Sequence, residues 1–294
     1  MRRRLVPARL SAVVPLLLAL FLARPFRLHA QDAPNHLYDK FSFTASGADV
    51  VLGSTFRIDN ADGTVGTEIE FGTLGLSKNA FAPLVGATWR PGRRHQLQLS
   101  YLYVSRSGEK VLTDTVRFAD TSFAAGLRIN SKFSAPSLSL AYRFAFVAKE
   151  KVQVGAQVTV GALFFGIDID ALAGATASGA DTAIVQYSAS RSLTGPTAAL
   201  GLYGAFRAGN NWYFGVEGGA IGAKISNISA TSWVFGGDAK YFVSNHWAFG
   251  AGWNYSGIKV TIDKSGSGGA LSPDFTGTIK YGFNVFRFGV VYAL

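Results

Sequence analysis

The residues of this chain that could carry out chemistry are few and far apart. Its histidines are His29, His36, His95 and His246. A histidine beside a serine could form a hydrolase, because the serine hydroxyl needs a nearby base to become a nucleophile. Asp168 and Asp170 could contribute to a calcium site, which requires clustered carboxylates. The sequence contains no cysteine, which excludes disulfides, thiolate metal ligands and cysteine nucleophiles.

The composition favours many short strands over helices. Of the 294 residues, 48% are hydrophobic and only 16% are charged, and 34 are glycine and 23 phenylalanine. Aromatic residues are enriched in strands, and glycine permits the tight turns that join them. Because there are no cross-links, we expect stability to come from burial and backbone pairing.

The net charge of +10 does not indicate a nucleic-acid partner. Six of the 28 basic residues lie within the first 30 positions, so residues 31–294 carry 22 positive and 18 negative charges. A nucleic-acid-binding protein concentrates its positive charge in a patch or stripe. No such patch is evident in the sequence, which therefore predicts no nucleic-acid partner.

Residues 1–30 have the three parts of a secretory signal peptide. A basic start, MRRRLVPAR, is followed by an apolar run from Leu10 to Ala23 and by RLHA before QDAP. We expect cleavage after Ala30. A retained membrane anchor is the alternative, although the run is shorter than the ~20 residues that a spanning helix needs.

Most of the remaining chain alternates between bulky apolar residues and small or polar ones. Between Trp247 and Ser256 the odd positions are Trp, Phe, Ala, Trp and Tyr, and the even positions are Ala, Gly, Gly, Asn and Ser. The same alternation occurs in 97–103, 137–146, 152–164 and 233–243. A period of two places alternate side chains on opposite faces of a strand. The sequence therefore predicts an all-β fold.

The less apolar face of these strands indicates which kind of barrel to expect. A soluble sheet would expose many lysines and glutamates, whereas this face carries mainly Gly, Ala, Ser, Thr and Gln, as the interior of a narrow barrel does. The apolar face has aromatic residues near both strand ends, where transmembrane barrels place theirs at the membrane interfaces. We expect a transmembrane barrel, and a soluble lipocalin-like barrel is the alternative.

The connections between the strands differ in length. Short polar turns are expected at 91–94, 148–151, 207–211 and 244–246, and longer connections at about 59–80, 107–132, 170–194 and 262–276, with a shorter one near 227–231. Outer-membrane barrels have short periplasmic turns and long outer loops. Four short turns, with both termini on the periplasmic side, give a single antiparallel up-and-down barrel of about ten strands. Eight would result if 50–58 lay outside the wall, and twelve if 114–132 added a pair.

The last strand resembles the C-terminal assembly signal of outer-membrane barrels. Arg287, Gly289, Tyr292 and Leu294 fill its pattern, with Leu where Phe is commonest. Together with the signal peptide and the alternation, it makes the sequence resemble the small barrels of the OmpA-type and OmpW-like superfamily. The resemblance implies a place in the outer membrane of a Gram-negative bacterium, with membrane lipid and the barrel-assembly machinery as partners. It divides the chain into a signal peptide (1–30), a periplasmic lead-in (31–42) and a transmembrane β-barrel (43–294).

Charged residues on the less apolar face are expected inside the barrel. They are Arg57, Arg90, Arg143, Arg207, Glu217, Asp238, Lys240 and Arg287. Because buried charges need partners, their mixed signs suggest ion pairs that fill the lumen. The alternative is a narrow, arginine-biased conduit for small solutes or anions, although open aqueous channels generally belong to larger barrels.

A lipid-modifying hydrolase, such as a lipid A deacylase, is the alternative function, because such enzymes occur on similar barrels. Most of them use a histidine with a serine at the outer leaflet, but His36 lies in the lead-in and His95 and His246 at expected periplasmic turns. Asp168 and Asp170 fit a solvated strand end better than a metal site. The sequence therefore predicts a barrel that is not an enzyme and uses no cofactor or metal. We expect a structural or surface-contact protein, or a narrow porin-like passage for small solutes.

Overall fold

The computed structural model describes residues 34–53, 55–59, 69–118, 121–175, 183–225, 228–262 and 276–294. No helix in these ranges is long and apolar enough to cross a membrane. The elements, in chain order, are η1 (His36–Tyr38), β1 (Phe41–Leu52), β2 (Thr55–Asp59), β3 (Ile69–Glu70), η2 (Phe71–Leu74), β4 (Asn79–Gly92), β5 (His95–Leu102), β6 (Ser105–Val111), β7 (Val116–Phe118), β8 (Thr121–Phe123), β9 (Arg128–Ser134), β10 (Ser137–Ala148), β11 (Val152–Ala175), β12 (Ala183–Ala208), β13 (Trp212–Ile225), β14 (Ile228–Phe242), β15 (Trp247–Ile262) and β16 (Thr276–Ala293).

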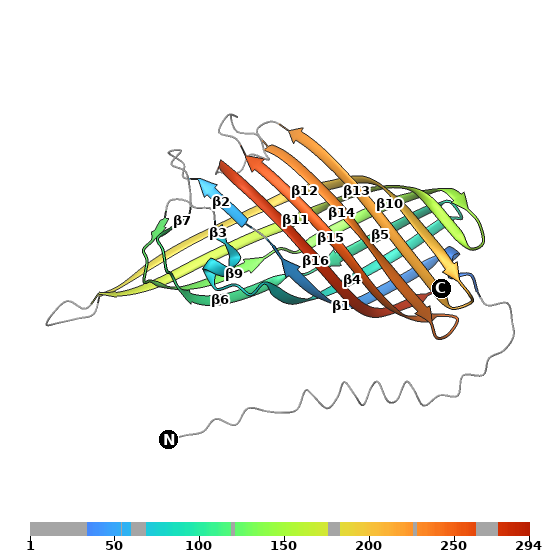
Figure 1. The fold of residues 1–294 in the computed structure, drawn as a ribbon, viewed down its shortest axis with the longest axis horizontal. Coiled ribbons are helices and arrows are strands. Elements are labelled where there is room, and N and C mark those ends of the chain that lie inside the picture. The colour runs from blue at the N-terminus through green and yellow to red at the C-terminus, as the bar shows by residue number, and fades with distance from the viewer. Residues whose placement is uncertain are drawn as a thin grey trace, which may run out of the picture. The chain divides into compact units, whose positions relative to one another are not determined.

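The strands form a closed antiparallel barrel (Figure 1). Its wall runs in the order β1-β4-β5-β10-β11-β12-β13-β14-β15-β16, and β16 pairs with β1 from Ser42 opposite Ala293 to Leu52 opposite Phe283. Closure leaves no strand edge, so every backbone group in the wall can be satisfied within the protein. The prediction of an all-β, ten-stranded up-and-down barrel is confirmed.

Shorter strands lengthen this wall at one end. β2 pairs with the start of β16, and β9 pairs with both β6 and β11. β7 and β8 form a separate hairpin outside the main sheet. Residues 50–52 and 55–58 therefore belong to the wall, which excludes eight strands. β6 and β9 continue β5 and β10 past short breaks, so they lengthen existing strands and do not raise the count to twelve.

The two ends of the barrel differ. The end with the short turns carries the start of β1 and the end of β16, and we call it the short-turn end (Figure 1). At the opposite, long-loop end the hairpin of β11 and β12 extends farthest, with paired residues up to Ala175 opposite Ala183. The expectation of a loop over 170–194 was therefore wrong for the described residues of that range, all of which are strand.

The hydropathy of β11 reverses along its length, and this explains the error. Near the short-turn end its inward residues are polar, with Gln153 and Gln157 buried, and its outward residues are apolar up to Phe164. Farther along, Ile167 and Ile169 are fully buried inside. Strand pairing continues past the point where the outer face ceases to be apolar, so loss of the outward apolar pattern does not mark the strand's end.

The interior of the long-loop end is a largely apolar core, although the buried guanidinium of Arg106 lies 5.9 Å from the centre of the Phe133 ring. Phe133 lies at its centre, with its ring 4.6 Å from that of Phe71, 5.3 Å from that of Phe165 and 6.1 Å from that of Tyr281, measured between centroids. Phe71 comes from η2, which ends at Gly75 in a left-handed conformation (φ 73°) and packs against β6. A Cβ at Gly108 of β6 would overlap the Gly75 carbonyl, so this close approach requires glycine.

We expect Phe133→Ala to lower the free energy of unfolding by about 3–5 kcal/mol, because it leaves a cavity in a packed core. Urea denaturation in detergent, followed by tryptophan fluorescence, would measure the change. Val111→Ala is the matched control, since Val111 is 48% exposed and its truncation should change stability by about 0.5 kcal/mol or less. Equal losses in the two variants would contradict a packed core at the long-loop end.

Candidate functional site in the barrel lumen

A connected row of polar side chains crosses the middle of the lumen. Arg143 Nη2 lies 2.5 Å from Glu217 Oε2, and Glu217 Oε1 accepts a hydrogen bond from Asn254 Nδ2 at 3.1 Å. Arg287 Nη1 donates to Asn254 Oδ1, and Arg287 Nη2 lies 3.7 Å from Asp238 Oδ1. The chain of contacts ends at Lys240, whose Nζ is 3.5 Å from Asp238 Oδ2. We call these six residues the charge belt.

Five strands contribute to the charge belt, and glycines on neighbouring strands make room for it. The strands are β10, β13, β14, β15 and β16. Gly252 pairs with both Asp238 and Arg287, and a Cβ there would lie 2.7 Å from Arg287 Nε. The alternation places the charges inward, and small neighbours let their side chains lie along the wall and meet.

The charge belt lies between two cavities. The inner chamber, toward the short-turn end, encloses about 100 Å³, and the outer chamber about 270 Å³. Arg143, Glu217, Asp238, Lys240 and Arg287 line both. The rest of the outer chamber is rich in hydroxyls, from Ser42, Thr44, Ser46, Thr88, Ser100, Ser137, Ser139 and Ser256.

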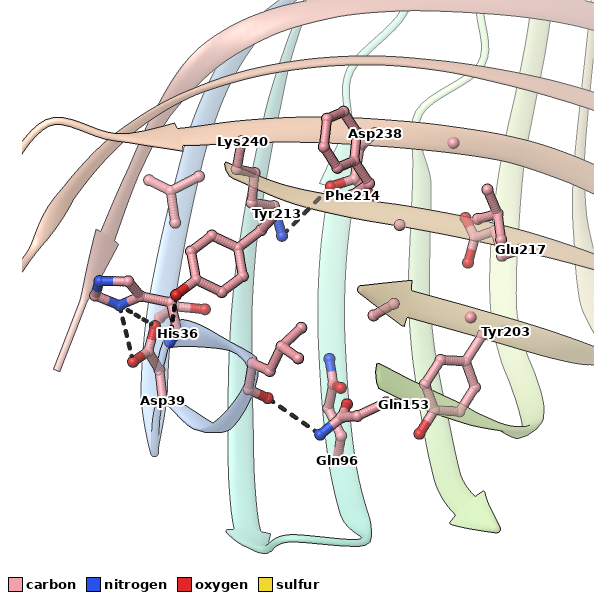
Figure 2. Close-up of a pocket in the computed structure, with 18 of the residues that line it drawn as sticks. His36, Asp39, Gln96, Gln153, Tyr203, Tyr213, Phe214, Glu217, Asp238 and Lys240 are labelled. Atoms are coloured by element: carbon pink, nitrogen blue, oxygen red, sulfur yellow. Dashed lines mark hydrogen bonds and ion pairs between the residues drawn. The ribbon is translucent and has the colours of Figure 1, made fainter. Parts of the chain in front are cut away.

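The segment before β1 closes the short-turn end. We call residues 35–39 the N-terminal plug. Leu37 is buried against a cluster that includes Tyr213, Phe242 and Val291, and the His36 ring stacks on Phe242 with 3.4 Å between centroids. Figure 2 shows His36 between Asp39 and Tyr213, its Nδ1 3.0 Å from Asp39 Oδ2 and its backbone amide donating to the Tyr213 hydroxyl.

Further hydrogen bonds attach this plug to the wall and to one turn. Gln153 Nε2 donates to the Leu37 carbonyl at 3.2 Å. The Tyr38 hydroxyl donates to the Lys149 carbonyl at 2.6 Å, and Asn35 Nδ2 donates to the Glu150 carbonyl at 2.7 Å. Residues expected to be only a lead-in thus form part of the lumen floor.

The predicted lumen residues fall into three groups. Arg143, Glu217, Asp238, Lys240 and Arg287 meet in the charge belt, and Arg90 lines the inner chamber beside Gln96 and Gln153. Arg207 lies instead at a turn, where its Nε donates to the Gly209 carbonyl at 3.0 Å, because its strand ends at Ala208. The side chain of Arg57 lies outside the described residues.

Sequence reasoning missed the neutral partners of these charges. Four neutral residues also face the lumen, and charge alone does not identify them: Gln96, Gln157, Tyr203 and Asn254. Their positions on the less apolar face could have identified them. Residues 35–39 show no alternation of apolar and polar side chains, so the sequence does not indicate that this segment lies in the lumen.

The predicted assembly-signal residues occupy different settings on β16. Arg287 belongs to the charge belt, and Gly289 pairs with Ser46 of β1 and Gly250 of β15. Tyr292 packs beside Trp247, with 4.8 Å between centroids, while Leu294 is exposed. Arg287 is thus both a residue of the predicted assembly signal and a member of the charge belt.

The described residues considered for hydrolysis or metal binding lie apart from one another, and His29 is outside the described residues. His36, His95 and His246 all lie at the short-turn end, where His95 contacts the Tyr142 hydroxyl and His246 the Ala293 carbonyl. Asp168 accepts a hydrogen bond from Ser190 Oγ at 2.5 Å. Among the described residues, no group of three or more His, Cys, Asp or Glu side chains could hold a metal ion.

The barrel resembles that of a solved outer-membrane protease. The outer-membrane protease OmpT from Escherichia coli matches with a TM-score of 0.56 and 10% identity, over 87% of this chain and 97% of that one. A Pseudomonas aeruginosa FadL homologue gives 0.37 and 8%, over 90% and 92%, and Ail, the attachment invasion locus protein of Yersinia pestis, gives 0.34 and 12%, over 86% and 98%. No protein-family model and no curated protein matches the sequence.

The chain therefore shares the closed antiparallel β-barrel architecture of a solved outer-membrane protein. The similarity to OmpT is one of architecture alone, because 10% identity does not carry residue roles from one protein to another.

We expect Glu217→Gln to lower the free energy of unfolding by about 1–3 kcal/mol, because it leaves the Arg143 guanidinium without its charged partner. Glu109→Gln is the control, since Glu109 also lies 2.5 Å from an arginine, Arg128, but both side chains are at least half exposed. Exposed pairs contribute about 0–1 kcal/mol. Urea denaturation of the two variants would measure the difference, and a larger loss for Glu109→Gln would contradict the structural importance of the charge belt.

Proposed function

We propose that this chain is an integral outer-membrane protein with a closed lumen, and that it acts through contacts made by its long-loop end. The observation that carries the proposal is the apolar core around Phe133, which occupies the interior between the outer chamber and the long-loop end. Ions do not pass readily through a packed core of phenylalanine and isoleucine side chains.

The outer surface of the wall supports a membrane location. Exposed residues on neighbouring strands are large and apolar, including Val160, Leu200, Leu202, Val216 and Phe288. Soluble monomers rarely expose a contiguous apolar surface of this kind. Exposed aromatic residues near the short-turn end, such as Trp89, Trp212 and Trp247, are where an interfacial girdle would lie. We place this end in the periplasm and regard membrane lipid and the barrel-assembly machinery as partners.

The OmpA-type and OmpW-like superfamily is the assignment within this class that we favour, on the sequence pattern of the signal peptide, the strands and the last strand. The interior is consistent with a barrel of this size, which side chains can fill.

A narrow passage for small solutes is the second candidate, supported by the hydroxyl-rich outer chamber. Passage would require displacement of the N-terminal plug and of the apolar core, in addition to a path through the charge belt. Because the N-terminal plug, the charge belt and the apolar core would all have to open, we favour the closed barrel over the passage.

A lipid-modifying hydrolase is less favoured. Its histidine base would need to lie beside a nucleophile at the outer leaflet, and the described histidines lie at the opposite end. We therefore propose a barrel without catalytic activity.

The location is tested by expressing the full chain in a Gram-negative host and separating the membranes on a sucrose gradient. We expect the protein in the outer-membrane fraction, with an electrophoretic band that shifts when the detergent sample is heated, because a closed barrel resists unfolding in cold detergent. Recovery from the soluble fraction without a heat-dependent shift would contradict the proposal.

The closed lumen is tested by single-channel recording of the purified protein in planar bilayers. We expect no steady conductance steps, since the lumen is filled at three levels. A porin inserted into the same bilayers provides the positive control. Reproducible, ion-selective steps would refute the closed barrel and favour the passage, and their loss or gain on Arg143 or Asp238 substitution would then identify the charge belt as the selectivity device.

A further inference from the structure

The inner chamber holds a partly buried cation, Arg90, that forms no ion pair with a carboxylate among the described residues. Its charged lining residues are Arg90, Arg143, Lys240, Arg287, Asp39, Glu217 and Asp238. Glu217 and Asp238 pair with the three cations of the charge belt, and Asp39 contacts His36. Within the described part of the chain, Arg90 contacts only neutral groups: the Gln96 and Gln153 Oε1 atoms at 2.7 and 3.4 Å, and the Tyr38 ring.

Two polar atoms of this chamber have unused hydrogen-bonding capacity. Arg90 Nε and the Tyr203 hydroxyl are both buried, and neither has a hydrogen-bond partner in the described structure. Tyr203 is only 3% exposed. Figure 2 shows its side chain extending into the chamber on the same side as Gln96 and Gln153. Buried polar atoms are rarely left unpaired, so these two indicate that something else contacts them.

The two groups without a hydrogen-bond partner, Arg90 Nε and the Tyr203 hydroxyl, can both donate to an anion. A guanidinium can only donate hydrogen bonds, and a tyrosine hydroxyl can donate as well as accept. The guanidinium of Arg143 lies 5.1 Å from the centre of the Tyr203 ring, which adds positive charge nearby. Water could satisfy the hydrogen bonds, but it would leave the charge of Arg90 uncompensated in a largely enclosed site.

We propose that the inner chamber binds one small oxyanion, of the size of phosphate, sulfate or a short carboxylate, between Arg90 and Tyr203. A volume of about 100 Å³ accommodates such an ion. Gln96 and Gln153 accept hydrogen bonds from the terminal nitrogens of Arg90 and thereby fix its orientation. A planar, fixed guanidinium is well suited to oxyanions.

Gln153 connects this site to the N-terminal plug. Gln153 accepts from Arg90 through Oε1 and donates to the Leu37 carbonyl through Nε2. The plug forms the floor of the chamber, so an anion that entered from the short-turn end would have to pass residues 35–39. This proposal does not depend on whether the long-loop end makes contacts, since it concerns the opposite end of the lumen.

The test is isothermal titration of the full chain, purified from membranes in detergent, with sodium phosphate and sodium sulfate. Chloride keeps the ionic strength constant. We expect one equivalent to bind, an affinity about tenfold weaker in Tyr203→Phe, which removes one hydrogen bond to a charged group, and no binding in Arg90→Gln. Arg207→Gln is the matched control, because Arg207 lies at a turn and does not line the chamber, and its affinity should equal that of the unmodified protein.

A second measurement locates the bound anion directly. Crystals of the unmodified protein and of Tyr203→Phe would be soaked in selenate, whose selenium gives an anomalous signal. A peak beside Arg90 in the unmodified protein supports the proposal. Absence of binding to phosphate and sulfate, a chamber that holds only water in selenate, or unchanged affinity in folded Arg90→Gln would each overturn it.

Discussion

The structure depends on one constraint: the inward side chains of a closed ten-stranded wall must fill a cylinder whose diameter the strands have already determined. Backbone pairing from β1 round to β16 fixes this diameter and leaves no edge that could relax. The interior can therefore be satisfied only by side chains that reach one another across it. Near the short-turn end these are polar and paired, and near the long-loop end they are apolar and packed.

The change from a polar to an apolar interior follows from the surroundings of the wall. Where the outer face is apolar, as along β11 up to Phe164, the inner face carries glutamine, threonine and glycine. Where the outer face carries Asp168 and Asp170, the inner face carries Ile167 and Ile169. The long-loop end is thus organised like a soluble β-barrel, with its core inside and its polar groups outside, on top of a barrel with the reverse arrangement.

The barrel, its strand number and its short turns could be predicted from the sequence, because each depends on local alternation and on turn composition. The inward direction of Arg143, Glu217 and Asp238 could also be predicted, since parity along a strand determines the face. Their partners could not be predicted, because the contact of Glu217 with Asn254 depends on the height of each residue along a tilted wall. That height follows from the register of several strand pairs, which no single segment contains.

The N-terminal plug imposes an order on the assembly of the molecule. It also bonds to Gln153, Lys149 and Glu150, but its apolar contacts are with Tyr213 of β13, Phe242 of β14 and Val291 of β16, all in the last third of the chain. Residues 35–39 precede every strand in the sequence, yet their binding surface exists only after the final strands are in place. Contacts of such long sequence separation form late in folding. Residues 35–39 can therefore reach their final position only once β13, β14 and β16 supply the surface on which they pack.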